Sequence, residues 1–282
     1  MRTTDDAHAD PILTGKGLIK VYASNGSGMA RKAAVDGIDV SLQPGECLAI
    51  IGESGSGKTT LSRLLLGQLR PDAGQVTYQG RPVLHGSPAA KALARDSALV
   101  FQNPFASLDP RWTIGRSVAE PLLAAKRRES GRVWYRYQKE RDLADQVAEA
   151  LSEVQLDPDR IMTAYPSDLS GGQAQRAAIA RALVVKPRIL LADEPMSAID
   201  VSARVGILHT LQSIMAQSRQ QSDSSSGMSM IIISHDLGVV QHIADRVMVL
   251  SQGKVVEEGP VRTILDHPNQ PYTRQLLAAA TL

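Results

Sequence analysis

The sequence has 282 residues, of which 43% are hydrophobic and 21% are charged. These fractions are ordinary for a globular protein and exclude collagen-like, coiled-coil and wholly disordered classes. The net charge of +2 does not point to nucleic acid or an anionic membrane as the main partner, and the single Cys47 excludes an internal disulfide and suggests a reducing compartment.

The first part of the chain predicts a tail, a group of strands and then a helix. Residues 1–11 are polar and acidic, so we expect a flexible tail without a signal peptide. Residues 12–48 hold short apolar stretches broken by Gly and Pro, which predicts strands. CLAII at 47–51 predicts a fully buried strand, and TTLSRLLLGQLR at 59–70 predicts a helix that ends before Pro71.

The rest of the chain alternates between strand and helix patterns. Strand patterns return at 75–84 and 97–101, and helical spacing dominates residues 104–187. RILLA at 188–192 and SMIII at 229–233 predict two more buried strands, each followed by polar residues and a helix. This alternation predicts an α/β fold with a mostly parallel sheet. No apolar run reaches the roughly 20 residues that a membrane span needs.

A phosphate-binding loop is predicted at GESGSGKT, residues 52–59. Its glycines let backbone N–H groups turn toward phosphate oxygens, and the following helix points its positive end at the same oxygens. Lys58 would place a charge near the β- and γ-phosphates, and Thr59 would offer a hydroxyl to Mg²⁺. A plain Gly/Ser turn before a helix is the simpler alternative. The expected nucleotide contacts are Gly52, Glu53, Ser54, Gly55, Ser56, Gly57, Lys58, Thr59 and Thr60.

The buried strand at 188–192 leads into two carboxylates, Asp193 and Glu194. Carboxylates at the end of a buried strand are unfavourable unless they meet a cation or a proton. Asp193 would hold Mg²⁺, and Glu194 would act as a general base on the attacking water. The alternative is an acidic strand end that is merely exposed to solvent.

Between the two phosphate motifs, LSGGQAQR at 169–176 resembles the signature of ATP-binding cassette (ABC) transporter ATPases. Further segments match that family in the same order: FQNP at 101–104, SAID at 197–200 and ISHD at 233–236. The resemblance implies a P-loop NTPase (RecA-like) core with an N-terminal antiparallel β subdomain and an inserted helical subdomain at about 104–187. The implied domain limits are 12–258 for the ATPase and 259–282 for a C-terminal extension.

The resemblance also implies roles for individual residues. Tyr22 would stack on adenine, Gln102 would reach Mg²⁺ and the attacking water, and His235 would contact the γ-phosphate. The signature loop would cap the nucleotide of a second chain in a head-to-tail dimer, through Ser170, Gly171, Gly172 and Gln173, with Asp200 beside it. The implied catalytic set is Glu194, His235, Gln102 and Lys58, and the implied metal ligands are Thr59, Gln102 and Asp193. Ile199 replaces the usual Leu, a change that should be tolerated.

Two segments are similar to the oligopeptide, dipeptide and nickel importer branch: QNPFASLDPRWTIG at 102–115 and HPNQPYTRQLL at 267–277. This similarity implies an ATP hydrolase that uses ATP and Mg²⁺ at the cytoplasmic face of the inner membrane to drive peptide import. The implied partners are a second, similar ATPase or a second copy, two transmembrane permeases and, indirectly, a solute-binding protein, but no nucleic acid. No iron–sulfur cluster is expected, because no cysteine-containing tail follows the second segment.

Other functions remain open at this stage. The same motor could serve nickel or another metal complex. A soluble ABC-type ATPase acting on DNA or ribosomes is less compatible with one cassette and the importer-like ending, and a non-hydrolysing subunit is less compatible with the full motif set. The basic, aromatic segment 126–141 predicts a charged helix face or a contact near the membrane partner, and the Ser-rich stretch 217–227 predicts a surface loop.

Overall fold

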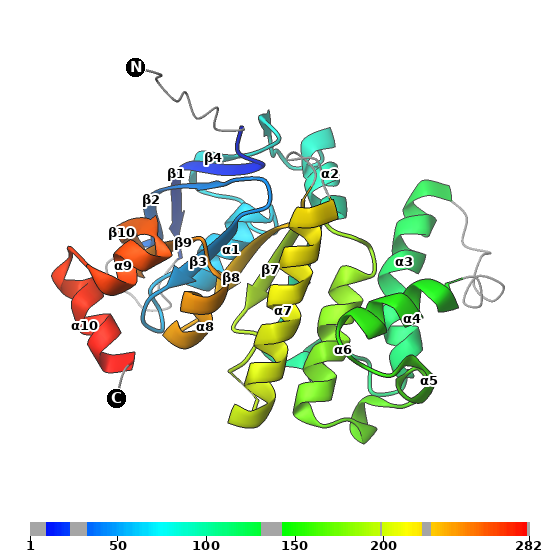
Figure 1. The fold of residues 1–282 in the computed structure, drawn as a ribbon. Helices are drawn as coiled ribbons and strands as arrows, with labels where there is room; N and C mark the ends of the chain where they lie inside the picture. Colours follow the sequence, from blue (N-terminus) through cyan, green and yellow to red (C-terminus); the bar gives the residue numbers. More distant parts are fainter. Residues whose placement is uncertain (1–9, 23–32, 131–142, 198, 222–226, 281–282) are drawn as a thin grey trace, which may run out of the picture.

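The computed structural model describes residues 10–22, 33–130, 143–197, 199–221 and 227–280. Residues 1–9 of the tail predicted at 1–11, the side chains of the basic segment 126–141 and residues 222–226 of the Ser-rich stretch 217–227 therefore lie outside the described part. Within the described part, the strands form two sheets, and helices surround the larger one (Figure 1).

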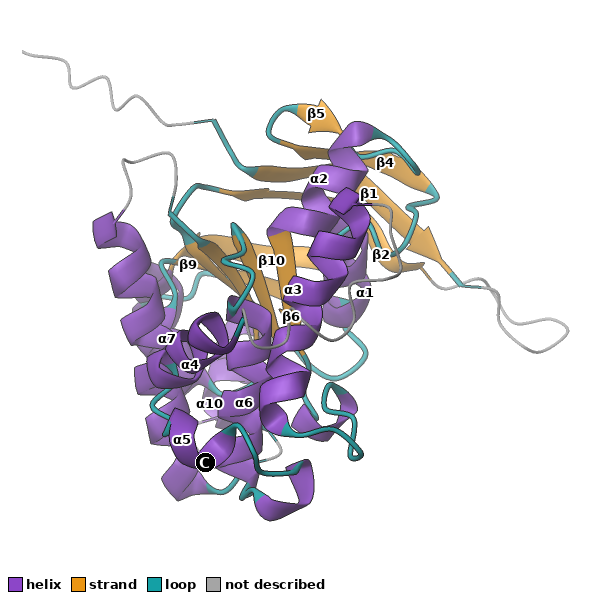
Figure 2. Ribbon diagram, turned by 90° about the vertical axis from the view of Figure 1, so that its right-hand side faces the viewer, coloured by secondary structure: helices purple, strands orange, loops and turns teal. Residues whose placement is uncertain are grey.

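The smaller sheet is antiparallel and has the strand order β2-β1-β4-β5. Its strands are β1 (Leu13–Val21), β2 (Ala33–Leu42), β4 (Ala73–Tyr78) and β5 (Arg81–Pro82). Figure 2 shows this sheet at the top of the molecule, away from most of the helices. It corresponds to the N-terminal antiparallel part that the sequence predicts.

The larger sheet, here called the core sheet, has the order β10-β9-β3-β8-β7-β6. Its strands are β3 (Cys47–Ile51), β6 (Ser97–Val100), β7 (Ile189–Asp193), β8 (Ser229–Ile233), β9 (Arg246–Ser251) and β10 (Lys254–Pro260). All neighbours are parallel except β10 and β9. The three strands predicted from buried apolar runs lie at its centre, and the α/β fold class is confirmed.

Both faces of the core sheet are buried, as expected for parallel strands. On β3, Ala49 and Ile51 belong to one apolar cluster, and Leu48 and Ile50 belong to the other. The first cluster includes α6 (Gly171–Leu183), α7 (Val201–Gln221) and α8 (Leu237–Ile243), and the second includes α1 (Lys58–Leu65) and the antiparallel sheet. Cys47 begins β3 and is fully buried in the first cluster.

Most of the remaining helices form two groups at opposite ends of the molecule (Figure 1). The segment before β7 contributes α3 (Ile114–Ser130), α4 (Ala144–Glu153) and α5 (Pro158–Ile161), with 3₁₀ turns at Pro104–Ala106 and Pro166–Asp168. At the other end lie α9 (Val261–Asp266) and α10 (Pro271–Ala280), beside β10. No helix of the described part combines the length and apolar character needed to cross a bilayer.

Three local features differ from the sequence expectation. The helix expected over 59–70 ends at Leu65, because Gly67 has a φ of +65° and closes the last turn well before Pro71. A helix that was not expected, α2 (Pro88–Asp96), starts where the Ser87 side chain accepts a hydrogen bond from the N–H of Ala90. Strand β10 continues to Pro260, so the predicted boundary after residue 258 falls inside a strand.

Candidate functional site

The loop between β3 and α1 needs glycine at two positions. A Cβ on Gly52 would lie 2.2 Å from the Leu250 carbonyl oxygen, and a Cβ on Gly57 would lie 2.2 Å from that of Ala34. Both residues also have positive φ angles, of 149° and 108°. Because a side chain would clash at both positions, the loop can follow this tight path only with glycine there.

Lys58 is buried under this loop and holds it closed. Its Nζ donates hydrogen bonds to the carbonyl oxygens of Gly52 at 2.7 Å and Glu53 at 2.9 Å. Burial lowers the pKa of this ammonium group. The lysine is thus held at the loop by main-chain oxygens, close to where a phosphate would lie.

The loop has polar groups that lack a protein partner. Gly57 precedes α1 and supplies no side-chain cap for the first N–H groups of the helix. The buried Oγ of Ser56 also has no hydrogen-bond partner among the described residues. Uncapped N–H groups at a helix start favour an anion, so these residues fit a nucleotide phosphate.

Asp193, at the end of β7, forms a side-chain hydrogen bond with Thr59 in the first turn of α1. Burial, and then the neighbouring charge of Glu194, raise the pKa of the Asp193 carboxyl group. Hard oxygen donors of this kind suit Mg²⁺, which usually takes one or two protein ligands together with phosphate and water. No group of three or more His, Cys, Asp or Glu side chains able to hold a metal lies in the described residues.

Two other predicted side chains, those of Gln102 and His235, lie at the carboxylate of Glu194. Its Oε2 lies 3.3 Å from the Gln102 Nε2 donor and 3.4 Å from the Nδ1 of His235. Its φ of +46° is unusual for a residue with a side chain, and its N–H donates to the Ile233 carbonyl oxygen at 2.9 Å. Gln102, Glu194 and His235 follow β6, β7 and β8. These strands are adjacent and parallel, so the three side chains lie at the same carboxyl-terminal end of the core sheet.

The signature residues lie elsewhere. Ser170 caps α6 through its Oγ, which accepts from the Gln173 N–H at 3.3 Å, while Gln173 Oε1 accepts from the Ser170 N–H at 3.0 Å. Ser170 and Gly171 are exposed. Because α6 and α1 pack on opposite faces of the core sheet, the structure does not bring these residues to the phosphate loop of the same chain.

Tyr22 lies at the rim of the phosphate loop. It follows Val21, which pairs with Ala33, and a Cβ on Gly57 would meet the carbonyl oxygen of the neighbouring Ala34. The Tyr22 side chain is 47% exposed, so its ring is available to a ligand. This position is compatible with a base bound beside the phosphates.

Asp200 and Arg204 organise the start of α7. The Asp200 Oδ1 accepts from the Ala203 N–H at 2.9 Å. Arg204 donates from Nε to the Ile199 carbonyl oxygen at 3.0 Å and lies 3.8 Å from the carboxylate of Asp236, next to His235. Sequence reasoning missed this arginine, which joins the SAID and ISHD segments. Its partners are a carbonyl oxygen and the carboxylate of a residue distant in the chain, so the sequence holds no signal for its role.

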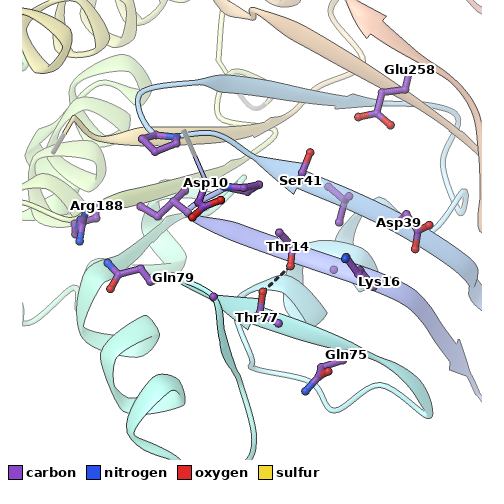
Figure 3. Close-up of a pocket in the computed structure, with 16 residues that line it drawn as sticks. Asp10, Thr14, Lys16, Asp39, Ser41, Gln75, Thr77, Gln79, Arg188 and Glu258 are labelled. Carbon is purple, nitrogen blue, oxygen red and sulfur yellow. Dashed lines mark hydrogen bonds between the residues drawn. The ribbon is translucent and has the colours of Figure 1, made fainter. Parts of the chain in front are cut away.

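A separate hollow lies at the antiparallel sheet (Figure 3). It has a volume of about 1040 Å³ and contains none of the predicted site residues. A 2.6 Å hydrogen bond joins the hydroxyls of Thr14 and Thr77 in its wall. Its charged residues are of both signs, for example Lys16 and Asp39, so its lining indicates no single ligand chemistry.

Sequence comparison places the chain among known proteins. A family profile described as ABC transporter matches residues 35–197. The glutathione import ATP-binding protein GsiA of Pectobacterium atrosepticum is 38% identical over 98% of this chain, which spans 42% of that relative. The oligopeptide transport ATP-binding protein OppF of Escherichia coli is 38% identical (88% of this chain, 70% of OppF). The dipeptide transport ATP-binding protein DppF of Haemophilus influenzae is 39% identical (95% of this chain, 78% of DppF).

Solved structures show the same architecture. A dimer of the ATP-binding cassette MJ0796 in a post-hydrolysis state with ADP and Pi has a TM-score of 0.71 and 27% identity. That match covers 89% of this chain and 99% of the MJ0796 chain. CbiO1 from Clostridium perfringens, part of the ABC transporter complex cbiONQ, has a TM-score of 0.73 and 25% identity, covering 92% of each chain.

Proposed function

This chain belongs to the ABC transporter family, and on that premise we propose that it is the ATP-hydrolysing subunit of an importer for small peptides. The observation that carries the proposal is the meeting of Gln102 and His235 at Oε2 of Glu194, beside Asp193 and the phosphate loop. A site that only bound a nucleotide would not need a carboxylate held in this way.

The phosphate loop would bind ATP through its main chain. The N–H groups of the loop and of the first turn of α1 would donate to phosphate oxygens, with Ser56 Oγ available as a further donor. Lys58 would leave its carbonyl partners for the phosphates, and Tyr22 would stack on the adenine. Glu53, Ser54, Gly55 and Thr60 complete the proposed lining.

Hydrolysis would depend on Glu194 as the general base. Its carboxylate would accept a proton from the attacking water, while Gln102 and His235 fix the carboxylate and the water. Thr59, Asp193 and Gln102 would hold Mg²⁺. When bound, the ion supplies positive charge that offsets the charge of the phosphate oxygens.

A second ATPase chain would complete the site. The signature residues Ser170, Gly171, Gly172 and Gln173, with Asp200, would act on the nucleotide held by that chain; Ser170 and Gly171 are exposed. The partner is either another copy or a similar subunit. ATP would favour the closed pair and ADP the open one, because a ligand shifts an equilibrium only through its different affinities for the two states.

The transported substrate is proposed from the relatives. Their names mention glutathione, oligopeptides and dipeptides, which favours a peptide over a metal complex. Two permease subunits would form the path through the cytoplasmic membrane, with this chain at the inner face and a solute-binding protein outside. The ATPase would span residues 12–258, with the helical insert at about 104–187 and the extension after it.

The substitution Glu194→Gln tests the ATPase assignment. We expect hydrolysis to fall about 100-fold or more, while ATP binding persists and the variant becomes a dimer in gel filtration with ATP. The wild-type chain with ATP and EDTA serves as the metal-free control and should not hydrolyse. A variant that stays monomeric and hydrolyses ATP at the normal rate would refute the assignment.

Substrate choice needs a cellular measurement. Cells that rely on this transporter should take up a labelled dipeptide with the wild-type chain but not with the Glu194→Gln variant. Nickel uptake in the same cells should not differ. Loss of nickel uptake without loss of peptide uptake would replace peptide by a metal complex as cargo.

A further inference from the structure

The segment that contains HPNQPYTRQLL is fixed to β10 by a polar clamp. The carboxylate of Glu257 accepts hydrogen bonds from the N–H groups of Asn269 at 2.8 Å and Gln270 at 3.2 Å. From the other side, Arg274 donates to the carbonyl oxygens of Pro268 at 3.1 Å and Asn269 at 3.0 Å. The turn before α10 is therefore held at both its N–H groups and its carbonyl groups.

The clamped turn sets the position of Tyr272 in the first turn of α10. The tyrosine is partly buried, and its ring packs against the apolar cluster on the α6–α8 face of the core sheet. Its hydroxyl oxygen accepts a hydrogen bond from the N–H of Glu53, at 3.4 Å. A residue 219 positions away along the chain thus contacts the phosphate loop directly.

The main chain of Glu53 takes part in three hydrogen bonds of the phosphate loop. Its carbonyl oxygen accepts from Lys58 Nζ at 2.9 Å and from the Ser56 N–H at 3.2 Å. Its N–H is the group that Tyr272 holds. Rotation of the backbone at Glu53 would move all three contacts together, including the one that orients the lysine.

We propose that Tyr272 is a positioning residue for nucleotide binding, which holds the first half of the phosphate loop in its binding conformation through Glu53. The inference rests on the proposed binding of ATP at this loop. The C-terminal element would then influence ATP binding, because correct docking of the turn at Glu257 sets the affinity of the phosphate loop for nucleotide. Any partner that moved α10 would then change ATP affinity without touching the nucleotide.

The test is Tyr272→Phe in the full-length chain, which removes the hydroxyl and keeps the ring. Loss of one neutral hydrogen bond should raise the Kd of a fluorescent ATP analogue and the KM for ATP by about 2- to 10-fold. The kcat should stay within about 2-fold, since the groups around Glu194 are untouched, and the Tm should not move measurably. Tyr165→Phe makes the same chemical change on an exposed tyrosine and should alter none of these values.

A second variant tests whether the contacts of Glu257 affect nucleotide binding through Tyr272. Glu257→Gln weakens the turn and should raise the KM, and adding Tyr272→Phe to it should raise the KM further by less than the two single effects predict. An unchanged Kd and KM in Tyr272→Phe would overturn the inference, and so would a fall in Tm with no change in KM. If the wild-type chain bound no ATP, or if Lys58→Ala bound it normally, the proposed function would fail as well, which separates the two failures.

Discussion

Two helices of this protein begin at sites suited to a phosphate, and they begin in different ways. Helix α1 follows Gly57 without any side-chain cap, over a buried lysine. Helix α6 follows Ser170, which forms a reciprocal capping box with Gln173, and Ser170 and Gly171 are exposed. The first N–H groups of α1 are left for a ligand, whereas those of α6 are capped by side chains at the start of the same helix.

The difference indicates how the work is divided within one chain. Uncapped N–H groups beside a buried lysine form an anion site that needs no other protein. A capped and exposed helix start is stable without a ligand, so it can be presented to another molecule. On the proposed function, the phosphate loop would bind nucleotide on its own, and the signature loop would contact a nucleotide held by a second chain.

The largest expected effect comes from the uncapped start of α1, where Lys58 is buried. Lys58→Ala removes the only side-chain charge that contacts the carbonyl oxygens of Gly52 and Glu53 within the described loop. We expect binding of a fluorescent ATP analogue to weaken about 100-fold or more, since a charged hydrogen-bonding group is lost from the phosphate site. Thermal unfolding without nucleotide serves as the control, because a folded but non-binding variant separates binding from stability.

Substitutions of two neighbouring glycines at the start of α6 should separate an effect on ATP hydrolysis from an effect on packing. A Cβ on Gly171 meets nothing within 4 Å, whereas a Cβ on Gly172 would lie 2.8 Å from the Ala203 Cβ. Gly171→Asp should therefore keep the Tm, yet lower ATP hydrolysis about 10-fold or more by placing a negative charge toward the partner's phosphates. Gly172→Ala should lower stability by about 1–3 kcal/mol through overpacking.

The ATP hydrolysis rate and the Tm of Gly171→Asp and Gly172→Ala would both be measured and compared with those of the wild-type chain. Normal hydrolysis by Gly171→Asp would mean that the signature loop does not face a nucleotide, and the division of work described above would be wrong. An unchanged Tm in Gly172→Ala would show instead that α6 and α7 adjust easily at Ala203.

The smallest expected effect concerns the rim of the phosphate loop. Tyr22→Ala should weaken ATP binding by about 3- to 10-fold, the size expected for one stacked aromatic ring at an exposed position. Binding of ATP and of inorganic triphosphate would be measured together, and only ATP should lose affinity. Equal losses for both ligands would assign Tyr22 to the shape of the loop rather than to the base.

The sequence predicts those parts of the fold that one local pattern determines. Continuous apolar runs identified β3, β7 and β8, because strands buried on both faces need them. The family to which the chain belongs was also recognised from its motifs. The end of α1 was placed too late, since the leucine spacing continues past Gly67 while the backbone does not.

Tertiary contacts explain what the sequence could not provide. Arg204 and Tyr272 act on the site through hydrogen bonds to the main chain of Ile199 and Glu53, and main-chain contacts leave no pattern in a single sequence. The roles of individual site residues remain predictions, although Gln102, Glu194 and His235 do meet. Their meeting depends on β6, β7 and β8 lying side by side in the core sheet, although helices α3 to α6 separate β6 from β7 along the chain.

The burial of Cys47 has a practical consequence for following this protein at work. Its thiol lies at the start of β3 with no exposed surface, and burial raises its pKa well above the usual range, so a thiol-directed dye should not react with it. Since the sequence contains no other cysteine, the unmodified chain already serves as an unlabelled background. One cysteine introduced on an exposed loop would then carry a single probe, and distances between two such probes could report subunit association in real time.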